Sequence, residues 1–152
     1  MNTAPSKAIR LDDFVPQDTA ELHVKIPGTE RPLGWIITFG GPSHPKTVAA
    51  AERASRKDLQ RSNEIEKAKI NGRKWKGDMD KAPDEVKREF IQTLVDRMVD
   101  WSPVALGDKE YPFTEATAVE LLIRPEMSPY VNQIVEFLLD DKAFMKASAI
   151  SS

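Results

Sequence analysis

Two hydrophobic periodicities follow one another along this chain, and their order constrains the fold more than any other feature. Between Leu22 and Phe39 apolar and polar residues alternate with a period of two, which is typical of half-buried strands. From residue 83 onward apolar residues recur every three or four positions, which is typical of helices packed on a core. This order predicts an α+β fold, in which an N-terminal antiparallel β-hairpin packs on a mainly helical body of about four helices.

The hairpin is predicted over residues 20–41. The residues on its apolar face are Leu22, Val24 and Ile26 in the first run and Leu33, Trp35, Ile37 and Phe39 in the second. Between the runs, the segment PGTERP carries the glycine and prolines of a turn. A lone hairpin is only marginally stable in water, so we expect its apolar face to pack on helices or on strands of another subunit.

A single long helix is predicted over residues 44–71. Ser43 suits the N-cap and Pro45 suits the first turn. Asn71-Gly72 suits the end, because glycine adopts the left-handed conformation without steric cost. No helix breaker interrupts the segment, yet large apolar residues are few. A helix this polar is weakly held by its own core, so it either projects into solvent or meets a partner.

The rest of the chain is predicted to form a linker, residues 72–83, and a helical part, residues 84–145. Together with the hairpin and the long helix they make one domain, residues 20–145. The first helix of the helical part is expected from Glu85 to about Trp101. Its apolar stripe consists of Val86, Phe90, Leu94, Met98 and Trp101.

Two shorter helices and two chain ends complete the predicted organisation. Thr114 suits the N-cap of a helix from Glu115 to about Ile123, and Ser128-Pro129 suits the start of a last helix that runs to Leu139. We expect residues 146–152 to form a flexible tail and residues 1–19 to form a flexible arm. The possible anchors of this arm are Ile9, Leu11, Phe14 and Val15.

The connector between Trp101 and Thr114 contains several residues that typically determine local chain structure. Gly107 marks a turn, and Tyr111 and Phe113 flank Pro112. Because Tyr111 and Phe113 are two residues apart, in an extended chain they share a face that can close over the core near Trp101. The connector therefore predicts a packed helix–loop–helix corner.

Reactive chemistry is sparse throughout the sequence. The chain has no cysteine and two histidines, His23 and His44, which argues against a zinc site. Neither phosphate-loop motif is present, and the acidic pairs fall at helix ends or in loops, where capping and solubility explain them. We therefore predict a protein that is not an enzyme, with no catalytic, cofactor-binding or metal-binding residues.

Charge is distributed unevenly along the chain. Residues 44–81 carry eleven Lys/Arg against six Asp/Glu, a net +5, whereas residues 82–152 carry seven against thirteen, a net −6. This polarity suits self-association or a charged protein partner, although two solvated faces without specific function explain it equally well. The candidate partner-binding residues are Arg53, Arg56, Lys57 and Arg61.

Nucleic acid is a less favoured partner. Trp75 lies between Lys74 and Lys76 and could stack on a base. Acidic residues interrupt the basic run, however, and the sequence pI of about 5.8 is far from a basic footprint. No apolar stretch approaches the 18 or so residues of a membrane span, and the N-terminus lacks the long apolar run of a secretory signal. We therefore expect a soluble protein of the cell interior with no membrane partner.

The segment VDWSPVALGDKEYPFTEATAVELL resembles the C-terminal signature of tailed-bacteriophage tail assembly chaperones. In that family a helix ends in a tryptophan-containing turn, followed by a glycine, a Pro-Phe-Thr or Pro-Phe-Ser segment and a helix with Glu, Ala and Leu. The structural signature residues here are Trp101, Gly107, Tyr111, Pro112, Phe113 and Thr114, followed by Glu115, Ala118, Leu121 and Leu122. The resemblance extends over about residues 20–145, and its specific part is residues 98–122.

This resemblance implies a function that needs no catalysis. Such chaperones bind the long hydrophobic tape measure protein, keep it soluble and recruit tail tube subunits around it. Many phages also make a longer, frameshifted form of them. The resemblance further implies a protein of the host cytoplasm that is absent from the mature virion. Two alternatives stay open: a virion structural protein of the tail tube or head–tail joint, and a small nucleic-acid-binding regulator.

Overall fold

A three-stranded antiparallel sheet forms the centre of the structure, a computed structural model that describes residues 8–74, 81–140 and 142–145. Strand β1 (Thr19–Lys25) pairs with β2 (Pro32–Gly40), and β2 pairs on its other side with β3 (Met98–Trp101). Ile37 lies opposite Leu22 on one side and opposite Trp101 on the other, so β2 is the central strand.

The predicted hairpin is confirmed, including its alternation. Val24, Ile37 and Phe39 are fully buried, whereas His23 and Lys25 are exposed. The prediction for Leu33 is wrong, because its side chain is exposed at the start of β2. The physical reason lies at Gly34, whose positive φ of 102° interrupts the alternation where the β1–β2 register shifts.

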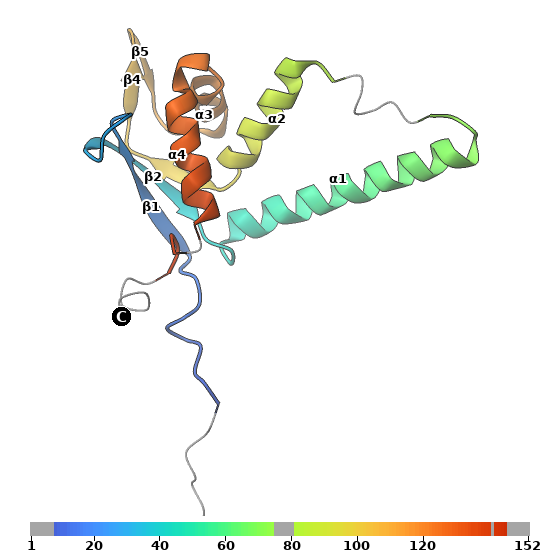
Figure 1. The fold of residues 1–152 in the computed structure, drawn as a ribbon, viewed down its shortest axis with the longest axis horizontal. Coiled ribbons are helices and arrows are strands. Elements are labelled where there is room, and N and C mark those ends of the chain that lie inside the picture. Colours follow the sequence, from blue (N-terminus) through green and yellow to red (C-terminus); the bar gives the residue numbers. More distant parts are fainter. Residues whose placement is uncertain (1–7, 75–80, 141, 146–152) are drawn as a thin grey trace, which may run out of the picture.

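The described residues contain four α-helices, of which α1 projects away from the sheet (Figure 1). They are α1 (Pro45–Ile70), α2 (Pro83–Val95), α3 (Glu115–Leu122) and α4 (Ser128–Leu139), with a 3₁₀ turn at Pro125–Met127. The α+β class and the N-terminal hairpin on a mainly helical body are thus confirmed.

Helix α4 covers one face of the sheet, and the core lies between them. The ring of Phe137 on α4 lies 5.2 Å from that of Phe39, and the ring of Tyr130 lies 5.8 Å from that of Trp35. The C-terminal part of α2 and most of α3 contribute seven further buried apolar residues. These are Ile91, Leu94, Val95, Ala118, Val119, Leu121 and Leu122. Burial of these side chains supplies the main stabilisation of the fold.

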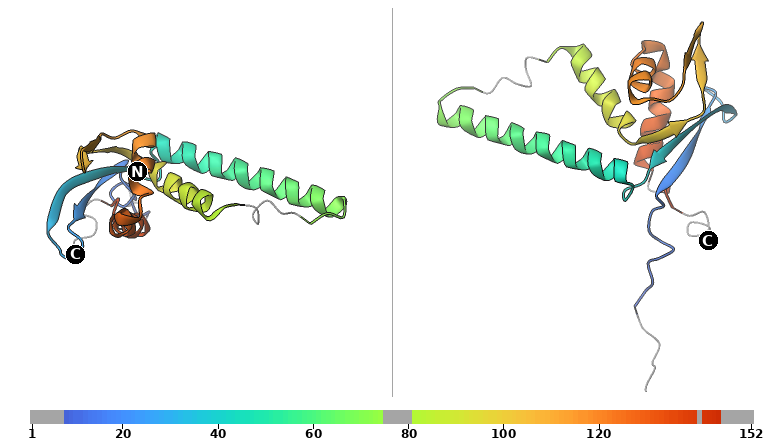
Figure 2. Two further views of the ribbon diagram at one scale, coloured as in Figure 1. Left: turned by 90° about the horizontal axis from the view of Figure 1, so that it is seen from above. Right: turned by 180° about the vertical axis from the view of Figure 1, so that it is seen from behind.

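The helix predicted from Glu85 to about Trp101 is wrong in its second half. Helix α2 ends at Val95, the cap is Asp96, and Met98–Trp101 forms strand β3. Met98 pairs with Phe39 and Trp101 pairs with Ile37, so β3 provides the backbone partner that the second edge of β2 requires. Val86 and Phe90, predicted to be buried, are exposed because the N-terminal half of α2 extends beyond the sheet (Figure 2).

The connector forms a second hairpin where only a turn was predicted. Strands β4 (Val104–Leu106) and β5 (Lys109–Tyr111) pair across Gly107-Asp108, and Gly107 has a φ of 63°. The predicted N-cap Ser43 is also wrong: the cap of α1 is His44, whose Nδ1 accepts a hydrogen bond from the Lys46 amide at 3.1 Å. The predicted cap Thr114 is confirmed, since its Oγ1 accepts from the Thr117 amide at 3.0 Å.

Candidate functional site

Helix α1 is the most exposed element of the described structure. It contains 26 residues, none of them buried, and most of its length extends away from the sheet in both views of Figure 2. Its sequence explains this position, because a helix with few large apolar residues gains little by packing on a core. Its surface is therefore available along most of its length.

Three large apolar side chains lie on one stripe of α1. Val48, Leu59 and Ile70 are separated by 11 residues each, which is about three helical turns and places them within roughly 40° of one another around the helix axis. Leu59 and Ile70 are 64% and 77% exposed. A shallow hollow lined by Pro42 and Ala51 lies beside Val48. The stripe can make apolar contacts with a partner at three separate points.

The basic residues of α1 lie mainly on another side of the helix. Arg53, Lys57 and Arg61 are four residues apart and lie roughly 120–200° around the axis from Leu59, whereas Arg56 lies next to the stripe. All four side chains are exposed. Arg53 pairs with Asp96 at 3.7 Å, and Arg56 pairs with Glu52 at 3.6 Å. The Arg56–Glu52 pair is exposed and therefore weak, so Arg56 can exchange Glu52 for a partner's carboxylate, whereas Asp96 in the other pair is half-buried.

The first turn of α1 is fixed firmly to the sheet. The Thr47 hydroxyl donates to the Gly40 carbonyl at 3.1 Å. The Lys46 ammonium donates to the Met98 carbonyl of β3 and lies 3.4 Å from the Glu115 carboxylate. It also lies 5.3 Å from the centroid of the Phe113 ring, within the range of a cation–π interaction. The start of α1 is thus bound to the same connector that carries the sequence signature.

The signature residues form a packed corner, as predicted, although strand β3 rather than a helix precedes it and the β4–β5 hairpin lies within it. The Trp101 indole N–H donates to the Tyr111 carbonyl at 2.9 Å, and the Trp101 ring meets the Phe113 ring edge-on at 5.4 Å. Trp101 and Tyr111 are buried and Phe113 is half-buried, whereas Pro112 is exposed. These contacts give the signature residues a structural role. The signal for the β4–β5 hairpin was present in the two-residue Gly107-Asp108 loop between alternating residues.

Perturbed titratable groups are few among the described residues, and two of them, Lys109 and Arg124, lie close enough to interact. Burial lowers the pKa of Arg97, whose guanidinium donates to the Gly40 carbonyl at 3.0 Å. The hydrogen bond from Lys25 lowers the pKa of Glu30. The pKa of Lys109 is raised by Glu120, and that of Arg124 is raised by Glu126. Each shift follows from burial or from an ion-pair partner of the group.

The described residues contain no group of three His, Asp or Glu side chains that could hold a metal ion. His23 lies on the surface, 3.6 Å from Glu21, and His44 caps α1. Trp75 and Lys76, the residues on which base stacking was considered, lie outside the described residues, as does the predicted tail. No helix in the described parts is long and apolar enough to cross a membrane.

Comparison with known proteins adds no relative. No family model, curated protein or solved structure matches this chain.

Proposed function

We propose that this chain is a tail assembly chaperone of a tailed bacteriophage, which binds the tape measure protein in the host cytoplasm and helps to recruit tail tube subunits. The signature residues around Trp101 and Phe113 support the family, and the surface of α1 supports a protein-binding role. In this proposal the protein has no catalytic step. It acts by covering a partner's apolar segments.

The observation that carries the proposal is the exposure of α1 over most of its length. A polar helix of 26 residues contributes little to its own domain's core, yet the chain orders it. A helix of that length is about 39 Å long, and a strip about 10 Å wide covers roughly 400 Å². A standard interface needs about 800 Å² on each partner, so the partner has to contact the apolar stripe and the basic side together.

Co-expression with the tape measure protein of the same phage tests the proposal. We expect the wild-type chain to raise the soluble yield of that protein and to co-purify with it. Replacing Leu59 and Ile70 with Gln removes the two most exposed residues of the apolar stripe without touching a buried residue, so we expect the complex to weaken while the free domain keeps its stability. Leu139→Gln is the matched control, because Leu139 on α4 is as exposed as Ile70.

Salt dependence separates the contribution of the basic side. Replacing Arg53, Arg56, Lys57 and Arg61 with Glu leaves the core intact, and its effect should be largest at low ionic strength. The Debye screening length falls from about 10 Å at 0.1 M to about 3 Å at 1 M, so contacts of exposed charges weaken with salt while apolar contacts persist. A complex that survives 1 M salt and fails only with the Gln variants would assign binding to the stripe.

Two experimental results would contradict the proposal, and each would favour another function. A chain that neither solubilises nor binds the tape measure protein but is present in purified virions would be a structural component of the tail tube or head–tail joint. Binding to DNA or RNA that falls steeply with salt would identify a nucleic-acid-binding regulator, because phosphate contacts release counterions.

A further inference from the structure

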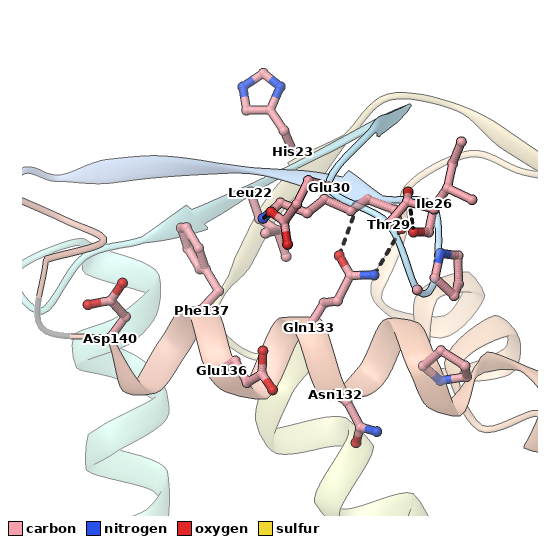
Figure 3. A pocket seen from close by; sticks show the side chains of 14 residues that line it. Leu22, His23, Ile26, Thr29, Glu30, Asn132, Gln133, Glu136, Phe137 and Asp140 are labelled. Carbon is pink, nitrogen blue, oxygen red and sulfur yellow. Dashed lines mark hydrogen bonds and ion pairs between the residues drawn. The ribbon is translucent and has the colours of Figure 1, made fainter.

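Helix α4 is bound to the edge of the sheet near its middle, in the pocket between α4 and the β1–β2 hairpin (Figure 3). The Lys25 amide donates to the Gln133 Oε1 at 2.8 Å, and the Gln133 Nε2 donates to the Lys25 carbonyl at 2.9 Å. A glutamine amide has the same donor and acceptor as a peptide unit, so Gln133 takes the place of a neighbouring strand. With the ring contact between Phe137 and Phe39, these bonds join α4 and the sheet into one packed unit.

The residues that follow α4 turn back onto this unit and bury one aromatic side chain. Phe144 is 6% exposed, and its ring meets the Phe137 ring edge-on at 5.6 Å. The guanidinium carbon of Arg97 lies 5.2 Å from the centroid of the Phe144 ring, within the range of a cation–π interaction. We call residues 142–145 the latch, and Phe144 is the side chain that anchors it.

Arg97 connects the latch to the base of α1. Its Nη2 donates to the Gly40 carbonyl at 3.0 Å, and its own carbonyl accepts from the Gly40 amide at 2.8 Å. The same Gly40 carbonyl accepts from the Thr47 hydroxyl in the first turn of α1 at 3.1 Å. A ring beside the Arg97 guanidinium limits the positions that this side chain can take. Phe144 therefore helps to hold the carbonyl to which α1 is bonded.

A second set of contacts runs through the residues just before β1. The Gln17 amide donates to the Phe144 carbonyl at 2.7 Å, and the Gly41 amide donates to the Asp18 carbonyl at 2.6 Å. The Ser43 hydroxyl donates to the Asp18 carboxylate at 3.1 Å. The latch thus holds the segment that in turn holds the loop leading into α1.

We propose that the latch fixes the angle at which α1 leaves the domain, with Phe144 as the positioning residue. Its two sets of contacts end on neighbouring residues, Gly40 and Gly41, where β2 gives way to the loop before α1. Helix α1 has 26 residues and is about 39 Å long, so a change of about 15° at its base moves its far end by roughly 10 Å. A partner that displaces Phe144 would therefore redirect α1. This inference does not depend on what α1 binds.

Distances between spin labels on the full-length protein test the proposal, measured by double electron–electron resonance. The chain has no cysteine, so two labels can be placed by two substitutions. Ser62→Cys on α1 and Asn132→Cys on α4, both at exposed positions, report the direction of α1. Lys87→Cys on α2 with Asn132→Cys is the control pair, because both of these helices are held by buried residues.

We expect the wild-type protein to give one narrow distance distribution for the 62–132 pair. Phe144→Ala should broaden this distribution or shift it by roughly 10 Å while leaving the 87–132 distribution unchanged. Leu122→Ala is the matched control, because it truncates a fully buried side chain on α3 outside both sets of contacts, so it should leave the 62–132 distribution as in wild type. An unchanged distribution in Phe144→Ala would overturn the inference, as would an equal change in Leu122→Ala.

Two milder variants keep the test decisive if Phe144→Ala does not fold. Gln17→Pro removes the amide that donates to the Phe144 carbonyl, and Arg97→Lys keeps the charge but removes the guanidinium. Neither truncates a buried apolar side chain, and each should broaden the 62–132 distribution. If both leave it unchanged, the latch does not position α1.

Hydrogen exchange at the Gly41 amide gives an independent measurement of the second set of contacts. Phe144→Ala should raise its exchange rate by about tenfold relative to the Ile37 amide of the central strand, since coupling of that size is common within one contact network. In Leu122→Ala the ratio of the two rates should stay as in wild type. A ratio that does not change in Phe144→Ala would contradict the link between the latch and the loop before α1.

Discussion

Two neighbouring tryptophans allow the value of one buried hydrogen bond to be measured against a matched control. Trp101 and Trp35 are 4% and 3% exposed, and their rings meet edge-on at 5.2 Å. The indole N–H of Trp101 donates to the Tyr111 carbonyl at 2.9 Å, whereas the indole N–H of Trp35 has no acceptor among the described residues. Replacing either residue with Phe removes the same atoms, but only Trp101→Phe breaks a hydrogen bond.

The expected difference follows from this contrast. Both variants lose packing, because the smaller ring leaves part of the site unfilled. Trp101→Phe additionally leaves the Tyr111 carbonyl without its indole donor, which costs about 1–3 kcal/mol for a buried group. Trp35→Phe removes an N–H that was already unpaired, so that cost does not arise. We therefore expect Trp101→Phe to lower the free energy of unfolding by about 1–3 kcal/mol more than Trp35→Phe.

Urea denaturation followed by far-UV circular dichroism measures both variants on the same scale. This signal is preferable to tryptophan fluorescence because each variant removes a fluorophore. Equal m-values are needed to read the midpoints as stability differences. If the two variants are equally stable, the Trp101–Tyr111 hydrogen bond contributes nothing net and the corner is held by ring packing alone.

Three other predictions concern the long helix, the base of the arm and one ion pair. Backbone amides of α1 beyond its first turn should exchange hydrogen faster than those of α4, since no residue of α1 is buried; equal protection would show that α1 is covered in solution. Gly41→Ala should destabilise the protein by about 1–3 kcal/mol in thermal or urea unfolding, because the added Cβ would lie 2.0 Å from the Gln17 carbonyl oxygen. An unchanged midpoint would mean that the backbone at Gln17 can move aside at no cost. Lys25 lowers the pKa of Glu30, so the ion pair stabilises the fold at pH values above the ordinary glutamate pKa of 4.5, and this stabilisation is lost as the pH falls below that value. The difference in unfolding free energy between wild type and Glu30→Gln should therefore shrink in acid. A difference that stays constant with pH would contradict the pairing.

Local sequence patterns were enough to predict those helices and strands whose structure and exposure follow from residues within the element itself. The β1–β2 hairpin follows from strict alternation with a glycine-containing turn, and the end of α1 follows from Asn71-Gly72, where Gly72 has a φ of 65°. The exposure of α1 was likewise predictable, because a helix without a broad apolar face has nothing to bury. In each case the signal lies within the element itself.

Strand β3 could not be predicted because its signal is shared with a helix. Leu94, Met98 and Trp101 are spaced by four and three residues, which fits a helical stripe, and both ends of Met98–Trp101 are also buried in the strand. Whether this segment forms a helix or a strand is decided by β2, whose second edge needs a pairing partner and which lies more than 50 residues earlier in the sequence. Gln133 was missed for a similar reason, because its partner Lys25 lies 108 residues away in sequence.

The connector and the candidate binding surface are parts of one arrangement. Trp101 packs edge-on against Phe113, and the other side of that corner receives the Lys46 ammonium from the first turn of α1. Because the described residues of α1 beyond this turn are not buried, the contacts of Lys46 and Thr47 at its base set the direction in which the helix leaves the domain. The corner that carries the family resemblance therefore fixes the orientation of α1, the helix that we propose as the partner-binding surface. A sequence signature far from the contact surface can in this way be required for binding.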